Sequence, residues 1–412
     1  MDSLSQPSAA AASTQSEVTQ LPQPPSGKVI TLVDLGVRVA LFAAFVGMLL
    51  RQVGASSFDE SLYPLLVYSL PAAAYLLAST PAVAAAIRRQ AESQPLGMAL
   101  LALVPLVPVV AYARVALDDF DWAQLLFGGV LIFLPAACAI LNVPQLRRAD
   151  VSLGLVTVAL PLLLPYVPDS GVRASAGPPA TFDIVLRVGA FLLPVALLVF
   201  TTREQKQRLN FLFLCAVTSL WYSVQFGAFP ELPIADRIDV TYYQLVIIPV
   251  FLYVLAVAGR FDRLGMMFNP TPRGVSIVAT NLVLLAAIGV PLGLVTGALT
   301  PTFHGPPPLE AAAQALSIFL LIALPQEILF RGTLLTYLQD ALHLDLRVAG
   351  IVSAVLFGAA QLSSSAGVSW LFVLAILTGA FCARVFLATQ NVVAAAVVHG
   401  FARWVRWLLF GG

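Results

Sequence analysis

Long apolar stretches recur along the chain after residue 30, and most are about as long as a helix that crosses a membrane. A transmembrane helix needs about 20 mostly apolar residues. The candidate stretches lie at roughly 31–50, 62–87, 96–116, 122–142, 151–167, 184–202, 209–229, 241–259, 274–299, 311–338, 347–362, 368–388 and 392–410. The pattern predicts an all-α, polytopic transmembrane bundle with about thirteen spans.

Polar and turn-forming residues divide this pattern into three regions. Residues 1–28 are rich in Ser, Ala, Gln and Pro, which predicts a disordered tail rather than a signal peptide. The stretch 168–183 is the richest internal one in turn residues, so we expect a boundary there. It separates an N-terminal transmembrane region of about five spans, 29–167, from a C-terminal bundle of about eight, 184–412.

Composition and charge support a membrane protein and exclude one class of partner. Of 412 residues, 59% are hydrophobic and 10% are charged, whereas soluble domains carry roughly 25% charged residues. The net charge of +1 makes no case for nucleic-acid binding. We expect the lipid bilayer and a membrane protein or peptide as partners, and the Ala- and Leu-rich style fits a bacterial plasma membrane.

Basic residues between the spans predict the orientation. With alternating spans, one set of connections carries twelve basic residues, among them Arg88, Arg89 and Arg347, and the other set carries four. Loops rich in Lys and Arg face the cytoplasm. We therefore expect the first set, and with it the N-terminus, to be cytoplasmic.

Two charged residues stand inside the apolar stretch 311–338. Glu327 and Arg331 are four residues apart, so they share one helix face and can neutralise each other. Ionisable residues inside a membrane are costly and usually functional, although such a pair can also serve only to join two helices. Pro325 precedes this pair closely and predicts a kink beside it.

Further polar residues follow in the last three stretches. Phe357 and Gln361 are four residues apart, as are His399 and Arg403. Taken singly, each has an ordinary structural interpretation. Gln361 can make a contact between helices, His399 can be a core histidine, and Arg403 can extend to the membrane–water interface. The three cysteines lie in apolar runs without metal-ligand spacing and are interpreted as buried small residues.

Taken in order over residues 311–405, these positions resemble the CPBP family of membrane-embedded proteases, which includes the CAAX prenyl endopeptidases. Its pattern is E-E-x-x-x-R, then F-x-x-x-H, then H-x-x-x-N, on successive helices. Here the corresponding residues are Gln326, Glu327, Arg331, Phe357, Gln361, His399 and Arg403. The resemblance implies an eight-helix CPBP-like bundle at the C-terminus and a site built on Glu327, Arg331 and His399.

The departures from this pattern fall on the residues that do chemistry. In the family, the first Glu is taken to activate water, and the histidines and Asn to hold a metal or stabilise an oxyanion. Gln326 cannot accept a proton at neutral pH. The resemblance leaves His399 as one zinc ligand, whereas a catalytic zinc usually has three. His343 lies about four turns beyond Glu327, and neither it nor His304 completes the site.

Three functions remain open. We predict a catalytically impaired family member that binds a membrane protein, peptide or lipid. The first alternative is an active intramembrane endopeptidase that uses Glu327 and His399, which the resemblance implies to be a metalloendopeptidase. In a different arrangement, Glu327 acts as the base while Arg403 pairs with Glu327 or donates to an oxyanion. The second alternative is a secondary transporter, although the chain shows no related halves of the kind that transporters often have.

Overall fold

All regular structure in the described part of the chain is helical, which agrees with the predicted all-α class. The computed structural model describes residues 31–53, 58–101, 104, 107, 248–249, 252–253, 255–257, 261–303, 305–340, 343–361 and 370–410. Five helices in these ranges are long and apolar enough to cross a membrane. The expected spans at 122–142, 151–167, 184–202 and 209–229, the tail 1–28 and the boundary 168–183 lie outside them, so the count of about thirteen stays a prediction.

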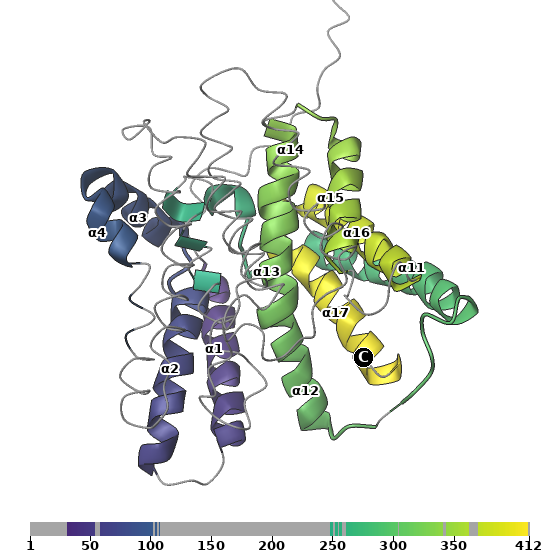
Figure 1. Ribbon diagram of the computed structural model, residues 1–412, viewed down its shortest axis with the longest axis horizontal. Coiled ribbons are helices and arrows are strands. Elements are labelled where there is room, and N and C mark those ends of the chain that lie inside the picture. The colour runs from purple at the N-terminus through teal and green to yellow at the C-terminus, as the bar shows by residue number, and fades with distance from the viewer. Residues whose placement is uncertain are drawn as a thin grey trace, which may run out of the picture.

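The first two helices form an antiparallel pair that ends in a sharp break. α1 (Leu32–Val53) contacts α2 (Phe58–Leu76) along its length (Figure 1). The single span expected at 62–87 is not straight, because α2 and α3 (Pro81–Ser93) meet at an angle of 101°. The Thr80 hydroxyl caps α3 by accepting from the Val83 N–H, and Pro81 occupies its first turn, so local sequence starts a new helix here. α4 (Pro95–Leu101) follows.

A single long helix stands at the centre of the molecule. It runs from Pro308 to Gln339 and consists of α12 (Pro308–Ser317), η5 (Ile318–Ala323), α13 (Leu324–Glu327), η6 (Ile328–Leu335) and the start of α14 (Thr336–Asp340). Figure 1 shows this helix between the N-terminal helices α1–α4 and the other C-terminal helices. η5 and η6 are π-helical. The helix continues through Pro325, and the turns on both sides of this proline are π-helical. The predicted kink stays a prediction.

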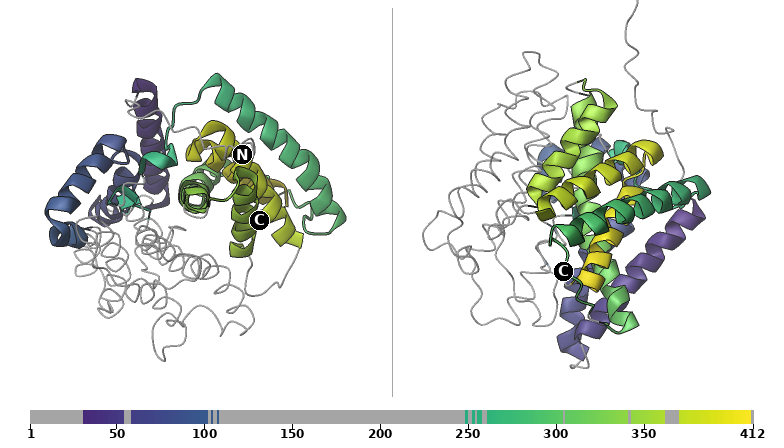
Figure 2. Two further views of the ribbon diagram at one scale, coloured as in Figure 1. Left: turned by 90° about the horizontal axis from the view of Figure 1, so that it is seen from above. Right: turned by 90° about the vertical axis from the view of Figure 1, so that its right-hand side faces the viewer.

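The other C-terminal helices cover one side of this central helix. They are α15 (Leu346–Ala360), α16 (Trp370–Thr389) and α17 (Val392–Phe410), with α11 (Pro272–Val295) lying across α16 and α17 (Figure 2). All four agree with expected stretches, and α15 is shorter than a full span. α15 and α16 pack closely because a Cβ on Gly379 would lie only 3.1 Å from the Ala354 backbone.

A short segment before α11 connects the two halves of the molecule. Gly265, with a φ of 55°, lies against Gln390 so closely that any Cβ would overlap the Gln390 carbonyl oxygen. Gly265 comes directly after the 3-10 turn η4 (Phe261–Leu264). The Asn391 amide donates to the Met267 carbonyl at 2.8 Å and accepts from the Val393 N–H, as expected of a residue that caps α17. The segment therefore holds the turn that positions His399.

Candidate active site

Glu327, Arg331 and His399 meet in one buried cluster. The Glu327 Oε1 accepts from Arg331 Nη1 at 3.0 Å and lies 3.0 Å from His399 Nδ1. The side chains of Glu327 and Arg331 are fully buried, and that of His399 is 5% exposed. The i, i+4 pair predicted from the sequence is confirmed, and packing of α13 against α17 adds the imidazole to it.

Arg331 also joins the central helix to α16. Its Nη2 donates to the Gly379 carbonyl at 2.6 Å. Such an approach to the α16 backbone is possible because Gly379 has no side chain. A guanidinium carries five N–H donors in a rigid fork, and here two of its nitrogens bridge a carboxylate and a backbone oxygen on different helices.

Aromatic rings cover one side of this charged cluster. Phe357 lies edge-on to His399, with ring centroids 5.0 Å apart, and edge-on to Phe330 at 5.3 Å. The Arg331 guanidinium carbon lies 4.7 Å from the Phe357 ring centroid. Cation–π contacts of this kind are worth about 2 kcal/mol or more when desolvated. The phenylalanine at the second motif therefore stabilises the cation and fixes the imidazole.

Two amides occupy the positions of the family's water-activating Glu and first His. The Gln361 Nε2 donates to the Gln326 Oε1 at 3.1 Å, and Gln326 is 6% exposed. Helix packing thus brings the first and second motifs together as expected. The two side chains in contact are amides, which carry no charge and do not accept a proton at neutral pH.

The remaining candidates do not join the cluster. Arg403 is exposed on α17, and in the described ranges Glu327 is bonded to Arg331 and His399 instead. His343 is exposed in the connection between α14 and α15, where it adopts a positive φ of 50°. His304 lies outside the described residues. The expectation that Arg403 pairs with Glu327 is therefore not met.

The donors present do not fit a zinc ion. Among the described residues, no three His, Cys, Asp or Glu side chains gather at one point. Glu327 Oε2 is buried without a hydrogen-bond partner among the described residues. The guanidinium bound to the other oxygen would repel a cation, and amide groups such as Gln326 and Gln361 are weak ligands for zinc, which is bound by Cys, His and carboxylates.

The widened turns of η6, which follow Glu327, are stabilised by hydroxyl groups. Thr333 Oγ1 donates to the Ile328 carbonyl at 3.0 Å, and Thr336 Oγ1 donates to the Gly332 carbonyl at 2.7 Å. Ser353 Oγ on α15 donates to the Phe330 carbonyl at 2.9 Å. These bonds satisfy backbone oxygens in and near η6. π-helical turns are frequent at functional sites, which fits their position beside Glu327.

A second buried ion pair was missed by the sequence analysis. Asp34 and Arg38 on α1 are 4% and 1% exposed, and Arg38 Nε donates to Asp34 Oδ2 at 2.6 Å. The remaining acceptors of Arg38 are the Leu76 carbonyl, the Ser79 carbonyl and hydroxyl, and the Met266 carbonyl. The same i, i+4 rule that selected Glu327 would have found this pair within the stretch 31–50. Its contacts join α1 to the α2–α3 break, which indicates a structural role.

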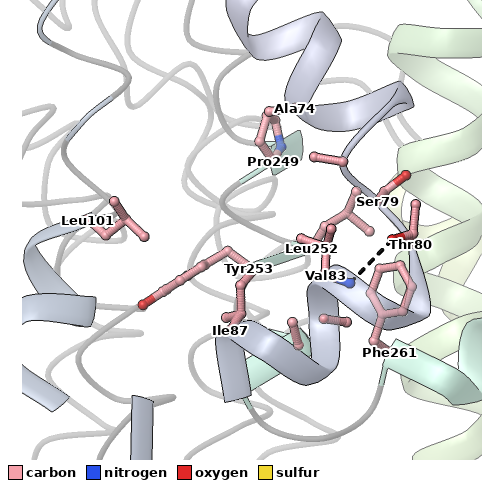
Figure 3. Close-up of a pocket in the computed structure, with 13 residues that line it drawn as sticks. Ala74, Ser79, Thr80, Val83, Ile87, Leu101, Pro249, Leu252, Tyr253 and Phe261 are labelled. Carbon is pink, nitrogen blue, oxygen red and sulfur yellow. Dashed lines mark hydrogen bonds between the residues drawn. The ribbon is translucent and has the colours of Figure 1, made fainter. Parts of the chain in front are cut away.

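A separate apolar cavity of about 170 Å³ lies at the α2–α3 break, away from the Glu327 cluster (Figure 3). Val83 and Ile87 of α3 face Leu252 and Tyr253 across it. The Tyr253 hydroxyl donates to the Met98 carbonyl at its edge. This cavity places no titratable pair against a reacting position, so it adds nothing to the candidate active site.

The comparisons with known proteins agree with the motif region. Residues 308–405 match the family model described as type II CAAX prenyl endopeptidase Rce1-like. No curated protein and no solved structure matches the chain. The matched range contains every motif position from Gln326 to Arg403, as the resemblance to the CPBP family implied. Residues 308–405 of this integral membrane protein are therefore an Rce1-like CAAX prenyl endopeptidase domain, consistent with the CPBP family.

Proposed function

We propose that this protein is a catalytically impaired member of its family, which acts by binding a membrane protein, a peptide or a lipid. The observation that carries the proposal is the pairing of Gln326 with Gln361 at 3.1 Å. Hydrolysis of a peptide bond needs a group that activates water and donors at the developing oxyanion. An amide–amide hydrogen bond at the corresponding position supplies no base.

The state of Glu327 supports the same conclusion. Its Oε1 contacts both Arg331 and His399, and its side chain is fully buried. A carboxylate held in this way is committed to an ion pair, and Phe357 closes one side of the cluster. The cluster thus stabilises the arrangement of α13, α16 and α17.

One observation favours the alternative, an active endopeptidase. The 3.0 Å contact between Glu327 Oε1 and His399 Nδ1 is the kind of carboxylate–imidazole pair that orients a histidine base in hydrolases. In this alternative, His399 activates water and Glu327 fixes its orientation. Transport by proton coupling through Glu327 is the remaining hypothesis, and the tests below separate all three.

The orientation and location are also proposals. Arg88 and Arg89 stand on α3, which follows the α2–α3 break. Because basic residues favour the cytoplasmic side, we propose a cytoplasmic N-terminus in a bacterial plasma membrane. Reactivity of a Cys substituted at Lys28 or Arg88 toward an impermeant thiol reagent, in intact and in lysed cells, tests the orientation.

The decisive experiment restores the family residues. Full-length protein in liposomes is given a prenylated CAAX reporter peptide, and the triple variant Gln326→Glu/Gln361→His/Arg403→Asn is compared with the natural chain. We expect no cleavage by the natural chain and measurable cleavage by the triple variant. The triple variant with His399→Ala added is the matched control and should be inactive. Retention of the uncleaved peptide by the natural chain measures binding.

Two outcomes would contradict the proposal. Cleavage by the natural chain that is lost in Glu327→Gln and in His399→Ala would support the active endopeptidase. Proton-coupled uptake that is lost in Glu327→Gln would support the transporter. Metal analysis of the purified protein adds an independent measure. Zinc at one ion per chain would contradict the conclusion that the side chains of this site do not fit a zinc ion.

A further inference from the structure

A surface groove runs between α15 and α16. Its volume is about 440 Å³, and its floor consists of small residues, including Gly350, Ala380 and Ala383. A Cβ on Gly350 would make ordinary contacts with Leu387 and Ala383, at 3.7 and 3.8 Å. The floor is therefore apolar, and its small side chains leave room for a hydrocarbon chain that lies along the helices.

Two arginines flank this groove, and none of the described residues that line it is acidic. Arg347 stands in the first turn of α15 and Arg384 in the last third of α16, and both side chains are exposed. Within the described part of the chain neither guanidinium has an ion-pair partner. The nearest acid in sequence is Asp345, whose carboxylate accepts from the Arg347 backbone N–H at 2.8 Å and so caps α15.

Arg384 stands in an apolar helix and has no ion-pair partner among the described residues. α16 is apolar enough to cross a membrane, and a charge facing hydrocarbon is costly unless it pairs or reaches the headgroups. Guanidinium groups bind phosphate with two parallel hydrogen bonds. Basic pockets between transmembrane helices are known to hold anionic lipid headgroups. The missing counter-charge is thus most simply a lipid phosphate.

We propose that this groove binds one anionic phospholipid. The phosphate lies between Arg347 and Arg384, and an acyl chain follows the small residues of the groove floor. α15 begins at the end of the bundle where α14 finishes (Figure 1), so the headgroup sits at one membrane surface and the chain points into the bilayer. The occupant is a structural lipid, separate from any partner of the Glu327 cluster.

The cavities near α3 lack this charge pattern. The polar cavity beside the apolar one of Figure 3 is lined by Arg88 and Arg89, but also by Glu92 and Asp262. Arg88 Nε already donates to Glu92 Oε1 at 3.4 Å. The charges there cancel, whereas those of the α15–α16 groove add up to +2 from Arg347 and Arg384.

The groove and the buried cluster use neighbouring residues of α16. Ala380 of the groove follows Gly379, whose carbonyl accepts from Arg331 at 2.6 Å. Because the groove and the cluster use different residues of α16, loss of the lipid does not depend on whether the protein cleaves peptides. The test below therefore fails or succeeds independently of the proposed function.

The test measures lipid retention by the full-length protein in detergent with native mass spectrometry. Phosphatidylglycerol and phosphatidylcholine with identical acyl chains are titrated, and inorganic phosphate is added in a separate arm. We expect one phosphatidylglycerol to be retained in preference to phosphatidylcholine, with no displacement by millimolar phosphate. At about 1 kcal/mol per arginine near a membrane surface, Arg347→Gln/Arg384→Gln should weaken this binding about 30-fold.

Two further variants make the result decisive. Arg88→Gln/Arg89→Gln removes the same two charges beside the α3 cavity and should leave the retained phosphatidylglycerol unchanged. Arg347→Lys/Arg384→Lys keeps the charge and should retain most of the binding. Equal binding by the natural chain and Arg347→Gln/Arg384→Gln, or equal loss in the Arg88→Gln/Arg89→Gln control, would overturn the proposal. Displacement by inorganic phosphate alone would indicate an anion site and overturn the lipid assignment.

Discussion

The buried pair of Glu327 and Arg331 allows a quantitative test of how the bundle is held together. Both side chains are fully buried, and the Arg331 Nη1 and Glu327 Oε1 atoms are 3.0 Å apart. Removal of one partner from a buried ion pair leaves an uncompensated charge and costs about 3–5 kcal/mol. Glu327→Gln leaves the guanidinium bonded to an amide and to the Gly379 carbonyl, and Arg331→Gln leaves the carboxylate with His399.

We expect each single variant to lose about 3–5 kcal/mol of unfolding free energy, but the double variant to lose clearly less than the sum. The reason is that two amides at i, i+4 can bond each other without any buried charge. A coupling energy of at least about 2 kcal/mol should follow from the cycle. In domains of 150–250 residues, each kcal/mol shifts Tm by about 2–4 °C, so single variants should melt about 6–20 °C lower.

The assay uses the free thiol of Cys382, which is fully buried in α16 beside this cluster. A thiol-reactive dye reports bundle opening on heating, in a background with Cys138 and Cys215 replaced by Ser. Denaturant titration in mixed micelles gives the unfolding free energies. Single-variant losses under about 1 kcal/mol, or additivity within about 0.5 kcal/mol, would refute the view that the pair is charged and coupled.

Three further predictions concern residues away from this pair. Gly265→Ala should lower Tm strongly or abolish folding, since a Cβ would overlap the Gln390 carbonyl at a positive φ; folding at the natural Tm would contradict this contact. Arg38→Gln should cost about 3 kcal/mol or more by leaving Asp34 buried and unpaired, measured by the same titration with the exposed Arg273→Gln as control. Ser353→Ala should cost about 1 kcal/mol, the value of one hydrogen bond, and a loss above 3 kcal/mol would show that the hydroxyl does more than satisfy the Phe330 carbonyl.

Local sequence determined much of the helical pattern. The stretches at 31–50, 274–299, 368–388 and 392–410 agree closely with α1, α11, α16 and α17, because a span requires a long apolar run whatever its neighbours are. The family resemblance was equally local, since it depended on residues at fixed spacing in successive helices, and the matched range 308–405 confirms it.

The break between α2 and α3 shows where periodicity was insufficient. The residues around Thr80 remain apolar, so a window of 20 residues includes them in one span. The Thr80 cap and Pro81 were readable as a helix start, but the 101° angle also depends on the Arg38 contacts with Leu76 and Ser79. Arg38 lies on α1, so these contacts cannot be predicted from the sequence around the break.

The sequence by itself determined that Glu327 and Arg331 share a helix face, because four residues make about one turn. It also determined that Gln326 and Gln361 replace ionisable residues. Only the tertiary structure decided that His399 lies on the same carboxylate oxygen, that Arg403 points elsewhere, and that the two glutamines bond each other. Spacing within a helix is set by backbone geometry, whereas spacing between helices is set by close approaches such as that at Gly379.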